Sequence, residues 1–254
     1  MNVHRPATLR ELDLEQYLGD PSLRQSYVTP MFDLIASRYD LFTRVFSFGM
    51  DRHWKQSLVS AARVGIAPGG TVCDAATGTG DLALALAAAR PDIRIAATDV
   101  SQRMLALAED RRNRAGSANI SVSGGDLAAL PFANASLDAI TAGYALRNTP
   151  DWRASIFELA RVIRPGGQLF TLDFFLPDSA AWRAAFLGWL SAAGRAVGWW
   201  WHREPMAYGY IAASIRHFTT AERFSAVLHQ SGFDVHAVDR RLGGGIALHH
   251  AVRR

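Results

Sequence analysis

The sequence predicts a doubly wound α/β fold, in which a Rossmann-like parallel sheet carries helices on both faces. Between residues 71 and 174, short apolar runs alternate with helical patterns, which indicates parallel strands joined by right-handed crossovers. Two further apolar runs, residues 233–239 and 245–252, flank a glycine-rich turn and indicate a closing pair of strands. The length of 254 residues, of which 49% are hydrophobic, suits one large domain with a sizeable core.

The expected elements follow in order along the chain. Residues 1–30 are polar and are expected to form an N-terminal arm, and residues 31–254 form the folded domain. Helical spacing of apolar residues predicts two helices between residues 31 and 64, separated by Phe48 and Gly49. Strands are expected at residues 71–75, 93–98, 120–123, 137–144 and 168–174, and helices at 82–89, 101–114, 151–163, 180–201 and 219–232. Ser101 is suited to cap the second of these five helices, and the Pro-Gly-Gly at 165–167 to end the third.

Composition and charge narrow the classes of function. Cys73 is the single cysteine, which excludes a disulfide framework and a cysteine-rich metal site. His202, His217 and His250 have no metal-ligand spacing with carboxylates, so no metal is expected. Residues 1–20 lack the apolar stretch of a secretory signal, and a cytoplasmic protein is expected. The net charge of +4 permits weak attraction to anionic lipid or nucleic acid but requires neither.

A ligand-binding turn is expected after the first strand. Asp74 lies near the end of that strand, and Gly78 and Gly80 follow before the next helix. Glycine lets a backbone approach a ligand closely, and a helix N-terminus offers free N–H groups. The spacing is not that of the dinucleotide fingerprint G-x-G-x-x-G. The alternative is a tight strand-to-helix turn that binds nothing.

Two more acidic residues follow the second and third strands. Asp99 comes about twenty residues after the glycines, where an acid can accept both hydroxyls of a ribose. Its alternative role is to stabilise a helix N-terminus, where negative charge is favoured. The local sequence at Asp126 is equally consistent with a ligand-binding residue and with an aspartate in a turn. Together with the glycine turn, these acids resemble the cofactor half of class I S-adenosylmethionine (SAM)-dependent methyltransferases.

Further motifs make the resemblance more specific. They are Phe32-Asp33-x3-Ser37-Arg38-Tyr39-Asp40, Ser47-Phe48-Gly49-Met50-x2-His53-Trp54-Lys55, Ala129-Leu130-Pro131-Phe132, Gly143-Tyr144-Ala145-Leu146-Arg147-Asn148, Arg161-Val162-Ile163-Arg164-Pro165-Gly166-Gly167, Ala213-Ser214-Ile215-Arg216-x-Phe218 and Ala247-Leu248-His249. In these motifs the chain resembles the UbiE/MenG family, whose members methylate a ring carbon of ubiquinone or menaquinone precursors. The resemblance implies a seven-stranded sheet with its last strand antiparallel and an N-terminal helical cap.

The resemblance also implies SAM as the cofactor and a hydrophobic aromatic or prenylated small molecule as the acceptor. The implied cofactor-binding residues are Tyr39, Asp74, Ala76, Thr77, Gly78, Gly80, Asp99, Val100, Met104, Asp126, Leu127 and Tyr144. The implied substrate-binding residues are Asn148, Tyr208 and Ser214, and the implied catalytic residues are Arg147, Arg216 and His249. Arg147 is suited to stabilise phenolate charge on the ring.

The chain departs from the family where the acceptor lid is expected, at about residues 178–218. Ala212 and Ala213 stand where the family usually has Pro-Glu, and Asp173 stands in place of a Glu. The expected acceptor is a prenylated hydroquinone, either demethylmenaquinol or a ubiquinol precursor. The nearest alternative is a specialised-metabolite C- or O-methyltransferase.

Two other classes of protein are less favoured. A nucleic-acid methyltransferase would end its fourth strand in Asn/Asp-Pro-Pro-aromatic or carry a Pro-Cys nucleophile, and this sequence has neither. No nucleic-acid partner is therefore expected. A non-catalytic SAM-binding protein is the other alternative, against which the glycine turn and Asp99 argue.

The aromatic segment 180–201 leaves several roles open. Arg195 interrupts its apolar run, and a membrane-spanning helix needs about twenty mostly apolar residues, so no transmembrane span is expected. The segment fits a lid over a hydrophobic acceptor, an interfacial helix on a membrane, a dimer contact or a buried core helix. Peripheral membrane contact and a homodimer both remain open from the sequence.

Overall fold

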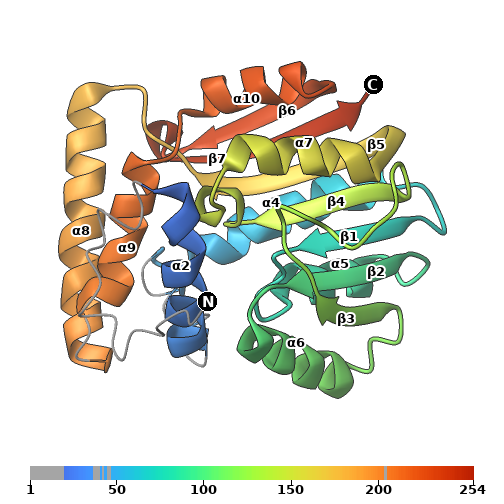
Figure 1. Cartoon of the computed structure of the whole chain (residues 1–254), viewed down its shortest axis with the longest axis horizontal. Helices are drawn as coiled ribbons and strands as arrows, with labels where there is room; N and C mark the ends of the chain where they lie inside the picture. Colours follow the sequence, from blue (N-terminus) through green and yellow to red (C-terminus); the bar gives the residue numbers. More distant parts are fainter. Residues whose placement is uncertain (1–19, 37–40, 42, 45–46, 203–204) are drawn as a thin grey trace.

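The computed structural model describes residues 20–36, 41, 43–44, 47–202 and 205–254. It confirms the predicted doubly wound α/β fold, with a seven-stranded sheet in the order β3-β2-β1-β4-β5-β7-β6 (Figure 1). Strands β1 to β5 are parallel, and β7 runs antiparallel to both β5 and β6. The strands are β1 Thr71–Ala75, β2 Arg94–Asp99, β3 Ile120–Gly124, β4 Leu137–Gly143, β5 Ile163–Phe174, β6 Phe233–Arg241 and β7 Ile246–Arg253.

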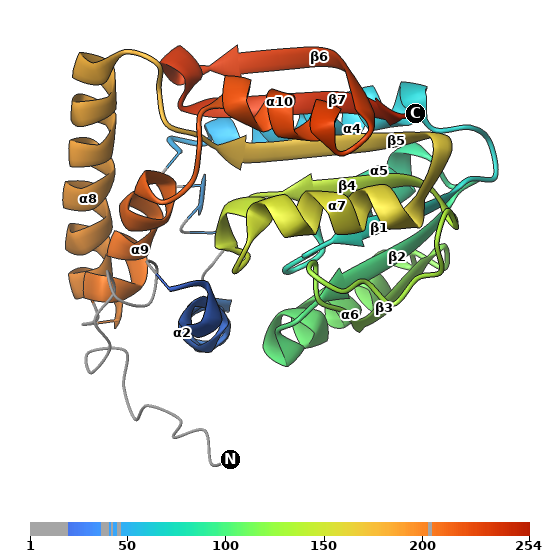
Figure 2. The same ribbon diagram turned by 45° about the horizontal axis from the view of Figure 1, so that its top comes forward.

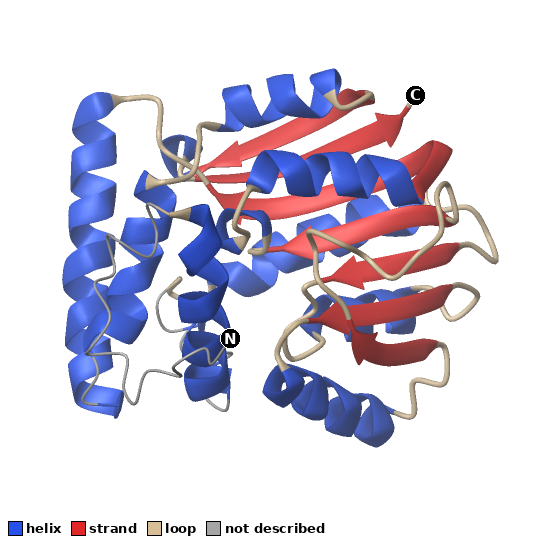
Figure 3. Ribbon diagram, in the orientation of Figure 1, coloured by secondary structure: helices blue, strands red, loops and turns tan. Residues whose placement is uncertain are grey.

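Helices cover both faces of the sheet, and a separate helical group lies beyond the ends of the parallel strands (Figures 2 and 3). The helices are α2 Pro21–Ile35, α4 Met50–Gly65, α5 Asp81–Ala89, α6 Gln102–Ala115, α7 Trp152–Val162, α8 Ala180–His202, α9 Pro205–Arg216 and α10 Ala221–Gln230. Helices α2, α8 and α9 form the group at the carboxyl end of the sheet (Figure 1). None of the helices in the described part of the chain is long and apolar enough to cross a bilayer.

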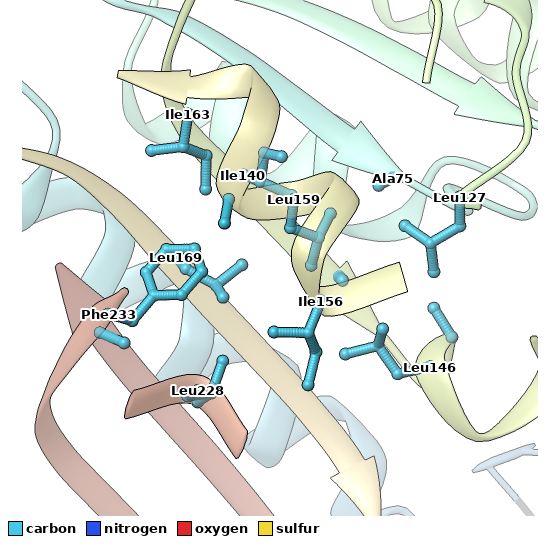
Figure 4. Close-up of a cluster of buried hydrophobic side chains, with 14 of the residues drawn as sticks. Ala75, Leu127, Ile140, Leu146, Ile156, Leu159, Ile163, Leu169, Leu228 and Phe233 are labelled. Atoms are coloured by element: carbon cyan, nitrogen blue, oxygen red, sulfur yellow. The ribbon is translucent and has the colours of Figure 1, made fainter. Parts of the chain in front are cut away.

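The sheet is covered by two buried layers, one on each face, and a smaller buried cluster lies between α8 and α9. On one face, Trp54 and Leu58 of α4 belong to the same buried cluster as Phe170 of β5. On the other face, Ile156 and Leu159 of α7 pack over the central strands (Figure 4). Burial on both faces explains why the central strands are nearly continuous apolar runs in the sequence.

Polar caps fix where several helices begin. The backbone N–H of Met104 donates to Ser101 Oγ at 3.1 Å, which confirms the predicted cap of α6. Asp151 Oδ1 accepts from the N–H groups of Arg153 and Ala154 at the start of α7. Each side chain satisfies N–H groups that have no partner within the helix.

The first difference from the sequence-based expectation is the start of α2. The helix begins at Pro21, inside the segment 1–30 that was expected to be an arm. Val28, Met31 and Ile35 are buried, and their spacing of three and four residues places them on one helix face. Met31 and Ile35 of this face lie after Pro30, which is itself within the helix. The polar composition of the residues before Pro30 therefore concealed the start of the helix.

The second difference lies at the Pro-Gly-Gly of residues 165–167. These residues do not separate α7 from a later strand, because β5 already begins at Ile163. They form a bulge, since Ile163 and Gln168 of β5 pair with Leu137 and Ala139 of β4. A Cβ on Gly167 would approach Ile163 Cγ2 to 2.6 Å, so the bulge needs glycine there.

Helix α9 was not predicted. Its sequence is almost uniformly apolar or small, and Tyr210, Ala213 and Ile215 are all buried. A helix that is apolar on most sides gives no 3.6-residue periodicity to detect.

Candidate functional site

The glycine turn between β1 and α5 has the backbone conformation that a close ligand approach requires. Ala76, Gly78 and Gly80 all have positive φ, at 52°, 57° and 85°. Gly80 is also the residue before α5, and a Cβ there would lie 3.3 Å from Ala108 Cβ of α6. The N–H of Thr77 donates to the carbonyl of Thr98 at 2.9 Å, which ties the turn to β2.

Asp74 is held at the end of β1 by two hydroxyl groups. Thr77 Oγ1 and Thr141 Oγ1 donate to its two carboxylate oxygens at 2.5 and 2.6 Å. Burial raises the pKa of Asp74 to about 6, and the two hydroxyl hydrogen bonds oppose that rise.

Asp99 joins the turn to the N-terminus of α6. The N–H of Gly78 donates to Asp99 Oδ2 at 2.8 Å, and the N–H of Ser101 donates to Oδ1 at 2.9 Å. Burial raises the pKa of Asp99, and these backbone hydrogen bonds oppose it. Each carboxylate oxygen retains acceptor capacity for a hydroxyl group of a ligand.

A pocket of about 920 Å³, here called the polar pocket, lies at the carboxyl ends of β1, β2 and β4. The structure brings most of the expected cofactor-binding residues to its wall, namely Asp74, Ala76, Thr77, Gly78, Asp99, Val100, Met104, Asp126, Leu127 and Tyr144. Gly80 shapes the turn without lining the pocket. Tyr39 lies outside the described residues.

The charge of the polar pocket fits SAM better than a dinucleotide. Asp74, Asp81, Asp99 and Asp126 line it, and among the described lining residues Lys55 is the only cation. Clustered carboxylates repel a pyrophosphate but attract a ligand with a sulfonium and an ammonium group. Val100, Met104 and Leu127 add the apolar surface that a flat base needs. The residues present therefore fit the cofactor implied by the resemblance.

A second pocket of about 1050 Å³, here called the apolar pocket, lies between α2, α4, α8 and α9. Its wall is mostly hydrophobic and aromatic, and includes Met31, Trp54, Phe174, Phe186, Trp189 and Leu190. Phe32 and Tyr144 line both pockets, so the two cavities adjoin at these side chains. Phe32 and Tyr144 therefore form part of the boundary between the two pockets.

Arg147 lines the apolar pocket as one member of a buried ion pair. Its Nη1 lies 2.6 Å from Asp173 Oδ1 and 3.0 Å from the carbonyl oxygen of Tyr144. Its guanidinium carbon lies 5.2 Å from the centre of the Phe174 ring. Burial raises the pKa of Asp173, and the adjacent guanidinium of Arg147 opposes this. The pair places a guanidinium group in a wall that is mostly hydrophobic.

Asn148 lies between the polar pocket and α9. Its Nδ2 donates to the Tyr144 carbonyl at 2.7 Å, and its Oδ1 accepts from the Tyr210 hydroxyl at 2.9 Å. Asn148 lines the polar pocket and is not among the described residues that line the apolar pocket, so its expected contact with the acceptor stays a prediction.

Three further expected residues, whose side chains the structure describes, do not line either pocket. His249 is buried beside Phe175 and Phe224, where its Nε2 lies 3.2 Å from the carbonyl of Ala221 and burial lowers its pKa to about 4. Ser214 is buried in α9 and donates to the carbonyl of Ile211. Arg216 is exposed at the end of α9, 3.4 Å from Ser191 Oγ. Tyr208 lies in α9, but its side chain is outside the described part.

Sequence reasoning missed the contributions of α2 and α4 to the site. Phe32, Asp51 and Lys55 line the pockets but were quoted only as parts of motifs or not at all. The sequence contained a signal that could have identified Asp51, because Asp51 shares the buried face of α4 with Trp54 and Leu58. An acid on the apolar face of a helix is unfavourable unless it has a partner or a function. Within the described ranges, no cluster of three His, Cys, Asp or Glu side chains has the arrangement of a metal site.

Comparisons with known proteins show the family and the fold of this chain. The model of the ubiE/COQ5 methyltransferase family matches residues 21–253. The demethylmenaquinone methyltransferase of Mycobacterium marinum is 36% identical over 87% of this chain and 91% of its own length. The ubiquinone/menaquinone biosynthesis C-methyltransferase UbiE of Syntrophotalea carbinolica is 34% identical over 85% of this chain and 90% of its own length. A SAM-dependent methyltransferase from Aquifex aeolicus shares the fold, with a TM-score of 0.57, 18% identity and coverage of 92% of this chain and 99% of its own.

Proposed function

This chain belongs to the ubiE/COQ5 methyltransferase family and is a SAM-dependent methyltransferase, and from that premise we propose that it methylates a ring carbon of a reduced, prenylated hydroquinone. The observation that supports this proposal is the pair of adjoining pockets. One is acidic and fits a cationic nucleoside, and the other is apolar and fits a hydrophobic ring with part of its tail. Relatives named as demethylmenaquinone methyltransferases make demethylmenaquinol the first acceptor to test.

The polar pocket holds and orients the cofactor in this proposal. Asp99 accepts the ribose hydroxyls, and Val100, Met104 and Leu127 pack on the base. SAM, when bound, supplies a methyl group that its sulfonium already makes electrophilic. The protein must then align the ring carbon with that methyl and exclude water. Tyr144 is placed at the junction where the two ligands would meet.

The apolar pocket favours a reduced ring. A quinone is electron-poor, whereas its quinol is electron-rich and becomes a stronger nucleophile as its phenol loses a proton. Arg147, in the pocket wall, stabilises negative charge on the ring oxygen. The ion pair with Asp173 fixes its position before the acceptor binds.

The test of this function is methyl transfer from SAM to matched oxidised and reduced demethylmenaquinone, followed by mass spectrometry. We expect a methyl group on carbon with the reduced ring and none with the oxidised ring. Equal transfer to both rings would contradict the proposal. Transfer to oxygen would favour a specialised-metabolite methyltransferase.

We also propose that the mouth of the apolar pocket touches a membrane surface. Phe48 and Trp189 line the pocket, are 72% and 51% exposed, and stack with their ring centres 5.8 Å apart. Exposed aromatic rings at the entrance of an apolar pocket suit entry of a prenylated acceptor from the interface of a bilayer.

Replacing both Phe48 and Trp189 with serine should reduce co-sedimentation with phospholipid vesicles several-fold, because exposed apolar area drives interfacial binding. Turnover of a long-tailed acceptor should fall more than turnover of a short-tailed one. Phe157→Ser is the matched control, since Phe157 is 55% exposed on α7 and lines neither pocket. Equal losses on both acceptors, with unchanged vesicle binding, would argue against membrane contact.

A further inference from the structure

The apolar pocket contains one buried acid. Asp51 lies in the first turn of α4, is 7% exposed and lines the pocket. Ser47 Oγ lies 3.2 Å from Asp51 Oδ1 and also accepts from the N–H of Asp51 at 3.1 Å. This local frame fixes the carboxylate against a wall formed by Trp54, Phe174 and other apolar side chains.

Asp51 is the group in this wall that is suited to accept a proton. Among the described residues that line the apolar pocket, it is the only carboxylate, and no histidine is present. The guanidinium of Arg147 donates hydrogen bonds and stays protonated. The hydroxyl of Tyr210 donates to Asn148. A hydroquinone hydroxyl in the pocket therefore finds a cation in Arg147 and an acceptor in Asp51.

Lys55 connects this acid to the other pocket. One helical turn after Asp51, its Nζ lies 3.5 Å from Asp51 Oδ2 and 2.9 Å from Asp81 Oδ2. Asp81 and Lys55 both line the polar pocket. The side chain of Lys55 thus connects the acid of the apolar pocket to the cofactor side, and its Nζ lies 6.0 Å from the centre of the Tyr144 ring at the junction.

We propose that Asp51 is the catalytic base that removes the proton from the acceptor's ring hydroxyl, an inference that rests on the proposed function. The hydroxyl proton moves to a carboxylate oxygen of Asp51, and the oxygen's charge increases electron density at the ring carbon. The carbon's electron pair forms the new bond to the methyl group, and the electrons of the broken bond stay on the cofactor's sulfur. The proton on that carbon then leaves to water, and Asp51 returns its proton to the ring oxygen. One proton is released in each turnover.

The decisive variant is Asp51→Asn, which keeps the shape and the contact with Ser47 but cannot take the proton. We expect kcat to fall by about 10²–10⁴-fold, the usual contribution of general base catalysis. Binding of S-adenosylhomocysteine, measured by calorimetry, should change by less than about threefold, because Asp51 lines the apolar pocket and is not among the described residues that line the polar pocket. Asp110→Asn is the matched control, since Asp110 forms an exposed ion pair with Arg114 on α6.

A second acceptor distinguishes a role of Asp51 as the base from a purely structural role of Asp51. A fluorinated hydroquinone whose hydroxyl is already ionised at the assay pH needs no base. With that acceptor, Asp51→Asn should approach the wild-type rate. An equal loss of kcat with both acceptors, or no loss with either, would overturn the assignment of Asp51.

A third variant keeps the inference testable if Asp51→Asn does not fold. Ser47→Ala leaves the carboxylate in place but removes the hydroxyl that orients it. We expect a loss of kcat of about tenfold, in line with roughly 1–1.5 kcal/mol for one hydrogen bond, and recovery with the ionised acceptor. An unchanged kcat would contradict the proposal. Failure of the proposed function would look different, because the wild-type enzyme itself would not methylate the reduced ring.

Discussion

Replacing Asp99 with alanine should weaken SAM binding by about a hundredfold or more. The carboxylate would hold two ribose hydroxyls in a buried site, and each hydrogen bond to a charged group contributes about 1.5–3 kcal/mol. The same change also removes the acceptor for the N–H of Gly78, which orients the glycine turn. Calorimetric titration with SAM measures the effect directly.

The fold should survive this substitution. The hydrogen bonds that Asp99 accepts come from backbone N–H groups, those of Gly78 and Ser101, so its removal does not leave a buried cation without a partner. Asp110→Ala on the exposed face of α6 is the control for a lost carboxylate. A folded Asp99→Ala protein with wild-type affinity would rule out a role for Asp99 in holding the ribose.

Replacing Arg147 with alanine should have two separate effects. The rate of methyl transfer should fall about 10²–10³-fold, the range for loss of one donor to a developing oxyanion. The melting temperature should fall by roughly 10 °C, because breaking a buried ion pair costs roughly 3–5 kcal/mol. SAM affinity should change much less than kcat, since Arg147 lines the apolar pocket and not the polar one.

The loss of stability should depend on pH in a defined direction. Burial already raises the pKa of Asp173, and removal of Arg147 takes away the cation that opposes this rise. The folded variant would then bind a proton at Asp173 more tightly than the unfolded chain does. Its free energy of unfolding should therefore decrease as pH rises from below the unfolded pKa through the raised folded pKa. The deficit relative to wild type should be larger at pH 8 than at pH 5.

Further variants separate the two effects. Arg147→Lys keeps the charge but not the planar fork, so it should restore stability more than rate. Asp173→Asn removes the partner and leaves Arg147 in the pocket wall. If Arg147→Ala turned over at the wild-type rate, Arg147 would have no part in stabilising the ring oxygen.

Much of the fold could be predicted because its signals are local. The buried central strands appear as apolar runs in the sequence. Ser101 indicates the start of α6, where its Oγ accepts a hydrogen bond from the N–H of Met104, three residues later. The motifs also predicted the family that the comparisons confirm. Helix α9 could not be predicted from periodicity, since its sequence is apolar on nearly every side.

The polar pocket was easier to predict than the apolar one for a physical reason. Asp74, Gly78 and Asp99 lie at or just after the carboxyl ends of parallel strands, which meet at one edge of the sheet. The apolar pocket is instead assembled from α2, α4, α8 and α9, which meet only through tertiary packing. Asp51 therefore escaped attention although it is buried there.

The position of His249 in β7 shows that strand register determines which layer of the core a motif residue enters. It pairs with Thr171 of β5, and its ring faces the aromatic cluster under α10. The neighbouring His250 faces the opposite layer, where its ring stacks on Phe170. Sequence similarity gave the motif, but only the alternation of side chains along β7 shows which layer each ring enters.

The position of β7 in the sheet has a consequence for how this protein is made. Strand β7 follows β6 in the chain but lies between β5 and β6, not at an edge of the sheet. Until Ile246–Arg253 has emerged, β6 has no strand to pair with, and β5 has an open side. The sheet can close only after β7 has been synthesised, and a deletion of β7 would divide the sheet internally instead of removing an edge strand.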